Sequence, residues 1–447
     1  MKITSSYGIE IRNMNKIFLP TAKIYQDAVS FCIDIFEKEW ASLSILHSVY
    51  QKSYAEHLIH TTKKNTAKYL EFDRKFYKMP IYLLRDVIST ALGHLNSYHS
   101  LIKNWENSGC IGKKPTLQKH LRIFPTFYKG SMNNSSEINS DKIYLKLYIQ
   151  NDWRFIPVKL KHTDMQYIRN HFEGKKISNP TLEKKFDKWF LRFAITEDVE
   201  LNKTSIRDQK ILAIDLGINT DATCSVMTSN GTILARKFIN FASEKDHIYH
   251  CLNKIKKVQQ KYSIKGTNQR KLWRYCSSLN AELSRKIAKE IVDYANQMQV
   301  DLIVFEHLDF KGKLRRGPKK QKLHLWKKST IQNLVEHKAH RQNIRISRVC
   351  AWETSSLAYD GSGKVLRGKD AGFTTNEICK FTTNKIYNCD LSASYNIGAR
   401  YFIRELQKSI PVMEWSGIVA KVPDCQKRTK CTYATLIELN KEIQKIA

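Results

Sequence analysis

The spacing of apolar residues changes along the chain, and each change predicts a different kind of element. From residue 22 to about residue 107, apolar side chains recur at helical intervals, most clearly at Leu83, Val87, Ala91 and Leu95. This spacing places the side chains on one face of a helix. We therefore expect this stretch to be largely helical.

The residues on either side of that stretch alternate in the way that strands do. Apolar and polar side chains alternate over 121–124, 143–148 and 189–193, and residues 1–19 resemble one or two edge strands that end near Pro20. Strands on both sides of a helical stretch predict one β-barrel that is interrupted by a helical lobe.

Beyond residue 207, two short apolar runs end in acidic residues. Residues 211–214 precede Asp215, and residues 302–305 precede Glu306. Short uninterrupted apolar runs of this kind are typical of fully buried strands. The other elements expected here are a hairpin around Asn230-Gly231 with strands over 222–228 and 232–238, helices over 244–262, 268–299 and 330–338, a strand over 344–349, an irregular Gly-rich segment over 354–388, a helix from Leu391 to Glu405 and a last helix from about Ala434.

The charge of the chain indicates the kind of partner. The 447 residues include 75 Lys and Arg against 42 Asp and Glu, which gives a formal net charge of +33. So large a surplus repels itself unless a polyanion is bound, so the expected partner is nucleic acid. A membrane is not expected, because no apolar run reaches spanning length. The lack of an apolar leader after Met1 and the scatter of ten cysteines predict a cytoplasmic protein with reduced thiols.

Three acidic residues stand at positions where a charge needs an explanation. Asp215 and Glu306 follow apolar strands, and an ionised carboxylate is costly to bury without a partner. Asp390 directly precedes the helix expected from Leu391. Each of these residues can also be explained without a function, although the explanation is weaker for some than for others. Asp215 can open the turn at Gly217, Asp390 can cap its helix, and Glu306 is the hardest to explain, because Glu is a poor strand residue.

The order of these elements favours a catalytic role. A strand that ends in Asp215, a hairpin, a helix, a strand that ends in Glu306 and a late helix with Asp390 follow one another as in an RNase H-like α/β nuclease. Three carboxylates in one cleft repel one another, and divalent cations that prefer oxygen ligands relieve the repulsion. Two Mg²⁺ or Mn²⁺ ions about 3.5–4 Å apart would activate a water and stabilise the leaving oxygen of a phosphodiester. We therefore predict that all three residues are catalytic and bind metal.

At these residues the sequence resembles a known family. Residues 213–219 (Ala-Ile-Asp-Leu-Gly-Ile-Asn), 303–308 (Ile-Val-Phe-Glu-His-Leu) and 388–398 (Asn-Cys-Asp-Leu-Ser-Ala-Ser-Tyr-Asn-Ile-Gly) are similar to the three RuvC motifs of the transposon-encoded TnpB (OrfB) proteins and the compact type V CRISPR effectors. The pair Thr354-Ser355 also fits the family pattern. The match covers about residues 208–405, whereas the N-terminal half matches only in layout.

The resemblance implies a prokaryotic RNA-guided DNA endonuclease in an α+β multidomain chain. Such a protein binds a structured guide RNA, pairs it with target DNA and cuts with a two-metal-ion RuvC site, and one copy or two bind each RNA. The implied domains are a β-barrel wedge (OB-like) domain over 1–19 and 109–207, a helical recognition lobe over 20–108, an RNase H-like (RuvC) nuclease domain over 208–350 and 390–405, a target-nucleic-acid-binding insertion over 351–389 and a C-terminal helical tail over 406–447.

One feature of the family is missing from the insertion. Relatives usually carry two Cys-x-x-Cys pairs between the second and third motifs, and these pairs form a zinc site. Here residues 356–359 (Ser-Leu-Ala-Tyr) contain no cysteine, and Cys379 has Thr382 where its partner would stand. Cys350 and Cys389 also lack paired spacing. We therefore expect no zinc, and an insertion that folds without metal or orders on nucleic acid.

A basic run beyond Glu306 is the main candidate for contact with the substrate strand. Runs of charge are ordinarily solvated loops. The position of this run beside the expected cleft favours nucleic-acid contact instead. Its members are Lys311, Lys313, Arg315, Arg316, Lys319, Lys320, Lys322, Lys327 and Lys328.

Two other functions stay open. A guided DNA-binding repressor would bind its target without cleavage, but such a protein would not need all three carboxylates. A transposase or resolvase of the same fold would act without RNA, but the long N-terminal half and the charge of +33 favour an RNA partner.

Overall fold

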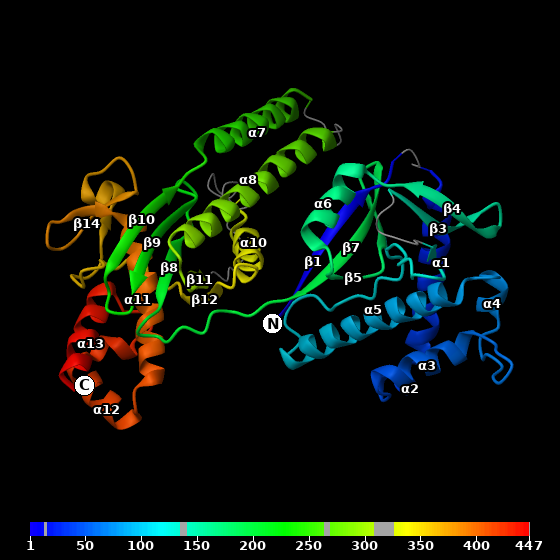
Figure 1. Cartoon of the computed structure of the whole chain (residues 1–447), viewed down its shortest axis with the longest axis horizontal. Helices are drawn as coiled ribbons and strands as arrows, with labels where there is room; N and C mark the ends of the chain where they lie inside the picture. The colour runs from blue at the N-terminus through cyan, green and yellow to red at the C-terminus, as the bar shows by residue number, and fades with distance from the viewer. Residues whose placement is uncertain (13–15, 135–140, 263–268, 308–325, 447) are drawn as a thin grey trace. The chain divides into compact units, whose positions relative to one another are not determined.

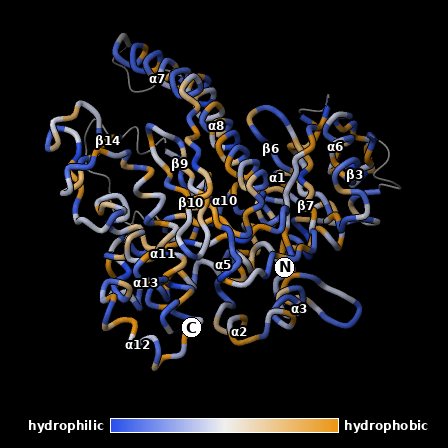
Figure 2. Tube along the Cα trace, turned by 60° about the vertical axis from the view of Figure 1, so that its left-hand side comes forward, coloured by the Kyte–Doolittle hydropathy of each residue, from blue (hydrophilic) through white to orange (hydrophobic). Residues whose placement is uncertain are grey.

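The computed structural model describes residues 1–12, 16–134, 141–262, 269–307 and 326–446. Contacts between residues divide the chain into two units, residues 2–197 and residues 198–447 together with Met1. Each unit has its own apolar core, and hydrophobic positions recur along the helices and strands of both (Figure 2). Among the described helices, none is long and apolar enough to cross a membrane.

The N-terminal unit combines helices with two small sheets (Figure 1). Its helices are α1 (Phe18–Lys38), α2 (Trp40–Ser44), α3 (Ser48–Ile59), α4 (Glu71–Lys75), α5 (Ile81–Asn107) and α6 (His162–Phe172). Its strands are β1 (Lys2–Glu10), β2 (Asn133–Asn134), β3 (Lys142–Ile149), β4 (Asp152–Lys159), β5 (Lys176–Ile177), β6 (Thr181–Lys185) and β7 (Lys188–Asp198).

The predicted helical stripe is confirmed in α5. Leu83, Val87 and Ala91 are buried, and α5 packs against α1. The start of α1 differs from the prediction, because the helix begins at Phe18 and Pro20 lies in its first turn. A proline is tolerated there because the N–H that it lacks would have no acceptor within the helix.

The strands of this unit form two separate ladders. One sheet has the order β1-β7-β5 with β6 on β7, and the other has the order β2-β3-β4. An isolated bridge between Ile11 and Leu160 joins the residues that follow β1 and β4. The strands of a split β-domain are therefore present, while their closure into a barrel stays a prediction.

One predicted strand of this unit is wrong. Residues 121–124 form no strand, although apolar and polar residues alternate there. The Gln26 side chain donates a hydrogen bond to the backbone oxygen of Ile123 (2.8 Å), and Ser30 Oγ donates one to the backbone oxygen of Lys119 (2.8 Å). The segment thus bonds to side chains of α1 instead of to a neighbouring strand.

The second unit is built around a larger sheet. Its helices are α7 (Ala242–Tyr262), α8 (Arg270–Gln297), α10 (Lys328–His340), α11 (Cys389–Ser409), α12 (Val412–Lys421) and α13 (Tyr433–Ile446), with short 3₁₀ turns η1 (Gly368–Ala371) and η2 (Pro423–Gln426). Its strands are β8 (Lys210–Asp215), β9 (Ala222–Thr228), β10 (Ile233–Ile239), β11 (Leu302–His307), β12 (Arg345–Cys350), β13 (Leu366–Arg367), β14 (Ile378–Lys380) and β15 (Ile386–Asn388).

Helices cover both faces of a five-stranded sheet in this unit (Figure 1). The strand order is β10-β9-β8-β11-β12, in which β8, β11 and β12 run parallel and the hairpin β9-β10 is antiparallel. One apolar cluster joins the sheet to α7, α8 and α10, and another joins it to α11 and α13. This α/β arrangement agrees with the alternation of elements predicted beyond residue 207.

The insertion is more regular than predicted. Its strands form a three-stranded antiparallel sheet in the order β13-β14-β15. The small core beside it contains Ala358, Cys379, Phe381 and Cys389. These strands have only two or three residues each, which is too few for a sequence period to emerge.

The C-terminal part holds one helix that the sequence analysis missed. Helix α13 was predicted almost at its observed start, whereas α12 was not predicted. Only Trp415 and Ile418 of α12 are buried, and Val412 and Met413 are 84% and 88% exposed. Trp415, Ile418 and Val419 share one face that packs against the core, but in so short a helix the exposed Val412 and Met413 obscure this helical spacing.

Candidate functional site

Asp215 is the last residue of β8 and lies on the sheet face that α11 covers. Side chains alternate between the two faces of a strand. Ile211 and Ala213 belong to the apolar cluster with α11, whereas Leu212 and Ile214 belong to the cluster on the opposite face. The alternation places Asp215 with Ile211 and Ala213. No turn hydrogen bond to its carboxylate is present among the described residues, so the turn-opening explanation is not supported.

Glu306 lies beside Asp215 on the neighbouring strand. Strands β8 and β11 are parallel, with Val304 opposite Ala213 and Phe305 opposite Ile214. Continued by one residue, this register brings Glu306 opposite Asp215. Glu306 is buried, with 8% of its surface exposed. The two acidic residues therefore lie side by side on the same face, at the ends of adjacent strands where only His307 follows Glu306 in β11.

Asp390 reaches this face from the first turn of α11. The helix begins at Cys389, two residues earlier than predicted, and Asn388 caps it by accepting a hydrogen bond from the Leu391 N–H (2.9 Å). The explanation of Asp390 as the helix cap is therefore wrong. A carboxylate in the first turn is stabilised by the positive end of the helix dipole, and it stays free for another role.

Glu306 and Asp390 both lie close enough to Asp215 for their charges to affect it. Burial raises the pKa of Asp215 well above its ordinary value, and the charges of Glu306 and Asp390 raise it further, while the Arg367 guanidinium lowers it. Burial also raises the pKa of Asp390, again against an opposing effect of Arg367. The structure thus brings together the three acidic residues that the sequence predicted.

Glu306 has protein partners that the other two carboxylates lack. Thr354 Oγ1 donates a hydrogen bond to Glu306 Oε1. Burial raises the pKa of Glu306, whereas this hydrogen bond and the charges of Arg400 and Lys328 lower it. Within the described part of the chain, no hydrogen bond or ion pair to the carboxylate of Asp215 or Asp390 is found.

A chain of hydrogen bonds extends from Glu306 into α11. The backbone oxygen of Thr354 accepts a hydrogen bond from Asn396 Nδ2 (2.9 Å), and Asn396 Oδ1 accepts one from the Tyr433 N–H (3.0 Å). Asn396 is fully buried. The sequence did not indicate Arg367 or Arg400, whereas Thr354 and Asn396 lie within the residues that carry the family resemblance. Their roles depend on contacts between segments far apart in the sequence.

The donor set fits divalent cations by its chemistry. Three oxygen-bearing acids lie in one electrostatic environment, and two of them lack a protein donor. The structure does not arrange them as ligands of one ion, because no group of three or more His, Cys, Asp and Glu side chains able to hold a metal forms among the described residues. In a two-ion site no single ion needs all three carboxylates. Metal binding by these residues stays a prediction.

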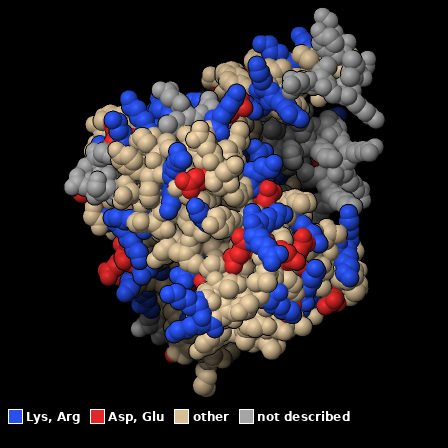
Figure 3. Space-filling view, turned by 90° about the vertical axis from the view of Figure 1, so that its right-hand side faces the viewer, with Lys and Arg blue, Asp and Glu red and all other residues tan. Residues whose placement is uncertain are grey.

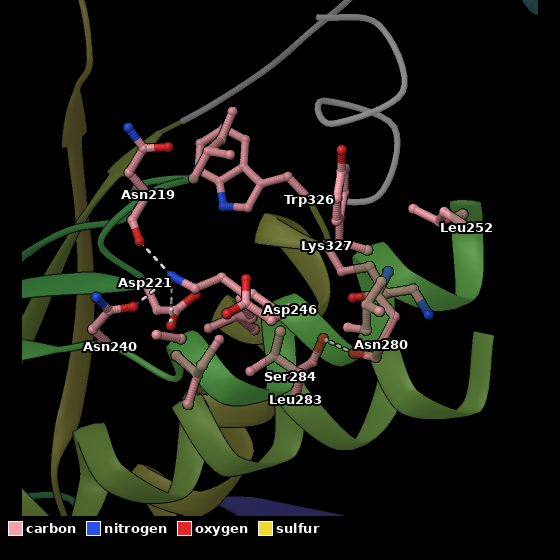
Figure 4. A pocket seen from close by; sticks show the side chains of 18 residues that line it. Asn219, Asp221, Asn240, Asp246, Leu252, Asn280, Leu283, Ser284, Trp326 and Lys327 are labelled. Carbon is pink, nitrogen blue, oxygen red and sulfur yellow. Dashed lines mark hydrogen bonds and ion pairs between the residues drawn. The ribbon is translucent and has the colours of Figure 1, made fainter. Parts of the chain in front are cut away.

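A pocket of about 390 Å³ adjoins the loop that follows Asp215 (Figure 4). Lys245 of α7 donates hydrogen bonds to the backbone oxygen of Asn219 and to Asn240 Oδ1 (2.6 Å), and it forms an ion pair with Asp221 (3.3 Å). Asp221 is buried. These bonds fasten the loop beyond the Asp215 strand to the start of α7.

The predicted basic run is described only at its end. Lys311, Lys313, Arg315, Arg316, Lys319, Lys320 and Lys322 lie outside the described residues. Lys327 lines the pocket of Figure 4, and the charge of Lys328 lowers the pKa of Glu306. Other Lys and Arg side chains are spread over the face drawn in Figure 3, where Asp and Glu are fewer. Contact of the run with nucleic acid stays a prediction.

Aromatic side chains pack around Tyr359 in the insertion. Tyr359 lies 5.6 Å from Phe381 and 5.0 Å from Tyr387 between ring centroids. Thr382 Oγ1 donates a hydrogen bond to the backbone oxygen of Ser362 (2.6 Å). The position where relatives have a cysteine partner is thus used for a hydrogen bond that joins two segments of the insertion.

Comparison with known proteins gives similarities in both halves of the chain. A family profile described as the Aq_aa04 family matches residues 4–149. The TnpB-like protein aq_aa05 of Aquifex aeolicus (strain VF5) is 23% identical over 264 residues, which cover 57% of this chain and 81% of that protein. The sequence resemblance to TnpB-like proteins is therefore confirmed.

Solved structures resemble the chain over most of its length. The Cas12f1–sgRNA–target DNA complex matches 86% of this chain and 81% of its own with a TM-score of 0.51 and 16% identity. The C2c1 protein of Alicyclobacillus acidoterrestris with single-guide RNA matches 87% of this chain and 67% of its own with a TM-score of 0.42 and 9% identity. The chain thus has a mixed α and β multidomain fold that is similar to the fold of Cas12f1.

Proposed function

We propose that the protein is an RNA-guided DNA endonuclease that cuts with Asp215, Glu306 and Asp390. The observation that carries the proposal is the convergence of these residues on one sheet face. Two of them lie side by side near the ends of adjacent parallel strands, the third lies in the first turn of the helix that covers them, and the charges of Glu306 and Asp390 act on Asp215. Strongly perturbed carboxyl groups that cluster in this way are typical of catalytic sites.

The proposed site would use two Mg²⁺ or Mn²⁺ ions held by the three carboxylates. When bound, such ions lower the pKa of an attacking water and stabilise the leaving oxygen of the phosphodiester. Thr354 fixes the orientation of Glu306 through its hydrogen bond. Asp215 and Asp390 present carboxylates without protein donors among the described residues, so their oxygens are free to bind cations.

The nucleic-acid partners follow from charge and from the relatives. The net charge of +33 suits a protein that holds two polyanions at once. The structurally similar Cas12f1 was solved with a guide RNA and target DNA. In a guided nuclease, base pairing reads the target sequence, and the protein holds the backbones through electrostatic contacts.

The proposal is tested by purifying the protein from its natural host and sequencing the RNA that copurifies. We expect one discrete RNA species, and we expect Mg²⁺-dependent cleavage of a DNA duplex that matches it. Binding of that duplex without cleavage would support a guided repressor instead. Absence of a discrete RNA, with cutting of bare branched DNA, would support an RNA-independent nuclease.

A further inference from the structure

A groove of about 1200 Å³ runs along the edge of the large sheet next to Glu306. It is bounded by the end of β12, the second half of α11 and the segment around η2. His307, which directly follows Glu306 on β11, lines the groove as well. Glu306 itself does not line the groove, but the residue that follows it on β11 does.

The lining of this groove is basic. Among the described residues that line it there is no Asp or Glu, and the cations are Arg348, Arg400, Arg404, Lys408 and Arg428. Carboxylates behind the lining balance only some of this charge. Glu336 pairs with Arg348 (2.6 Å), and Glu405 pairs with both Arg404 (2.8 Å) and Lys408 (3.0 Å). Such an excess of positive charge favours a phosphate backbone.

Arg428 is the cation in this lining that is most available to a ligand. Its residue is exposed, and no carboxylate pairs with it in the described part of the chain. Lys408 keeps 63% of its side chain exposed despite its ion pair with Glu405. Both side chains can reach a phosphate without breaking the packing of the core.

Trp352 adds an aromatic surface to the same groove. It is 69% exposed, although burial of a large apolar ring is energetically favourable. Buried Arg400 holds its backbone in place by donating hydrogen bonds from Nη1 to the backbone oxygens of Cys350 (2.8 Å) and Trp352 (2.7 Å). An exposed ring on a fixed backbone is suited to stacking with an unpaired base.

A short connection links Trp352 to the catalytic site. Thr354, two residues further along the chain, donates its hydrogen bond to Glu306. The charge of Arg400 also lowers the pKa of Glu306. Two residues at the groove, Trp352 and Arg400, are thus connected to Glu306, one through the neighbouring Thr354 and the other through its charge.

We propose that this groove binds a single strand of the DNA substrate as it approaches Glu306. In this arrangement Arg428 and Lys408 contact its phosphates, and Trp352 stacks on one of its bases. The combination of a basic groove and an exposed aromatic ring suits single-stranded nucleic acid of any sequence. A duplex fits less well, because its bases are already paired and stacked. The inference rests on the proposed nuclease function and names the path of its substrate.

The test uses the full chain with its guide RNA and the Asp215→Asn substitution, which prevents cutting. The probe is a fluorescein-labelled oligodeoxythymidine of about 12 nucleotides, within the range of single-strand binding sites. We expect Trp352→Ala to weaken binding about 5-fold or more, while Trp352→Phe keeps most of it. We expect Arg428→Glu to lower the slope of log affinity against log salt by about 0.7 for each lost phosphate contact.

Lys430→Glu is the matched control, because Lys430 is an exposed cation of the same segment that does not line the groove. An oligonucleotide with 5-iodouracil locates the contact directly, and we expect its photo-crosslink at Trp352. If Arg428→Glu and Lys430→Glu change oligonucleotide binding equally and the crosslinks lie elsewhere, the proposal that the groove binds the strand is wrong. Weaker guide RNA binding with unchanged oligonucleotide binding would overturn it as well.

The same variants in the protein that keeps Asp215 separate this inference from the proposed function. We expect them to slow cleavage of a matched target while its guide RNA stays bound. A chain that keeps Asp215 but never cuts would refute the proposed function, whatever the oligonucleotide assay shows. A chain that cuts equally well with and without Trp352 and Arg428 would refute only the groove.

Discussion

Asp215 and Glu306 lie side by side on neighbouring parallel strands, on the same face of one sheet, but among the described residues only Glu306 receives a hydrogen bond from a protein side chain. Glu306 is therefore oriented by Thr354 before any substrate arrives. Asp215 has a raised pKa, because burial and two neighbouring carboxylates disfavour its charge. Glu306 and Asp215 thus differ in how the protein controls them: a hydrogen bond orients Glu306, and the surroundings of Asp215 raise its pKa.

The hydrogen bond from Thr354 to Glu306 predicts a defect in catalysis but not in target binding. Thr354→Val keeps the shape of the side chain and removes its hydroxyl group. We expect the cleavage rate to fall about 10- to 100-fold, as is usual when a group that orients a metal ligand is lost. The Mg²⁺ concentration for half-maximal rate should rise. Thr354→Ser keeps a hydroxyl and should retain most of the cleavage rate. A Thr354→Val variant that cleaves as fast as the original protein would contradict this role of Thr354.

Arg367 predicts a second catalytic defect. Its charge lowers the pKa of both Asp215 and Asp390, and its buried Nη2 has no hydrogen-bond partner. It is thus placed to offset negative charge in the site, including that of a bound phosphate. We expect Arg367→Gln to reduce single-turnover cleavage about 100-fold or more, the usual effect of removing one such donor. Lys369→Gln, an exposed change two residues away, should leave the rate unchanged.

The raised pKa of Asp215 predicts how stability depends on pH without metal. At low pH the carboxyl is protonated in both the folded and unfolded states and contributes nothing. As pH rises above the ordinary carboxyl range, the unfolded chain ionises first, so folded stability decreases until pH passes the raised pKa. In the metal-free protein, the Asp215 carboxyl should therefore lower the free energy of unfolding at neutral pH, whereas at acidic pH it should have no effect.

Asp215→Asn removes this effect and should raise the melting temperature of the metal-free protein, more at pH 8 than at pH 5. Mg²⁺ should raise the melting temperature of the original protein but not that of the variant. Scanning fluorimetry across the pH range measures both effects. Asp370→Asn, at an exposed carboxylate, is the control. If the difference in melting temperature between Asp215→Asn and the original protein shrinks as pH rises, the predicted direction of this pH dependence is wrong.

The packed core of the insertion predicts that its stability depends on Tyr359 and not on zinc. Tyr359 contacts the rings of Phe381, Tyr387 and Tyr395. We expect Tyr359→Ala to destabilise the protein by about 3 kcal/mol, as for other large aromatic truncations, and Tyr359→Phe to cost much less. Elemental analysis should find well under one zinc per chain. Stoichiometric zinc, and a fall in melting temperature on its chelation, would contradict this interpretation.

The sequence predicted Asp215 and Glu306 because each follows an unbroken apolar run. It predicted Asp390 from the order of the elements and from the family resemblance. The helix start was placed two residues too late because Asp390 and Asn388 are both favourable cap residues, and the structure uses Asn388. Arg367 and Arg400 were missed because their partners lie in other segments. The strand expected at 121–124 was wrong for a similar reason, since the side chains of Gln26 and Ser30 bind its backbone. Local pattern predicts which residues are buried, but it does not reveal which distant side chains they meet.

The central claim is that the carboxylate cluster cuts DNA under the direction of a guide RNA. Its most direct test compares the original protein with Asp215→Asn, each bound to the same guide RNA, on a matched DNA duplex with Mg²⁺. The account predicts equal target binding and a cleavage rate at least about 1000-fold lower in the variant, since loss of a group at the reacting atoms removes several kcal/mol of transition-state stabilisation. Cleavage by the variant at the original rate would contradict the claim.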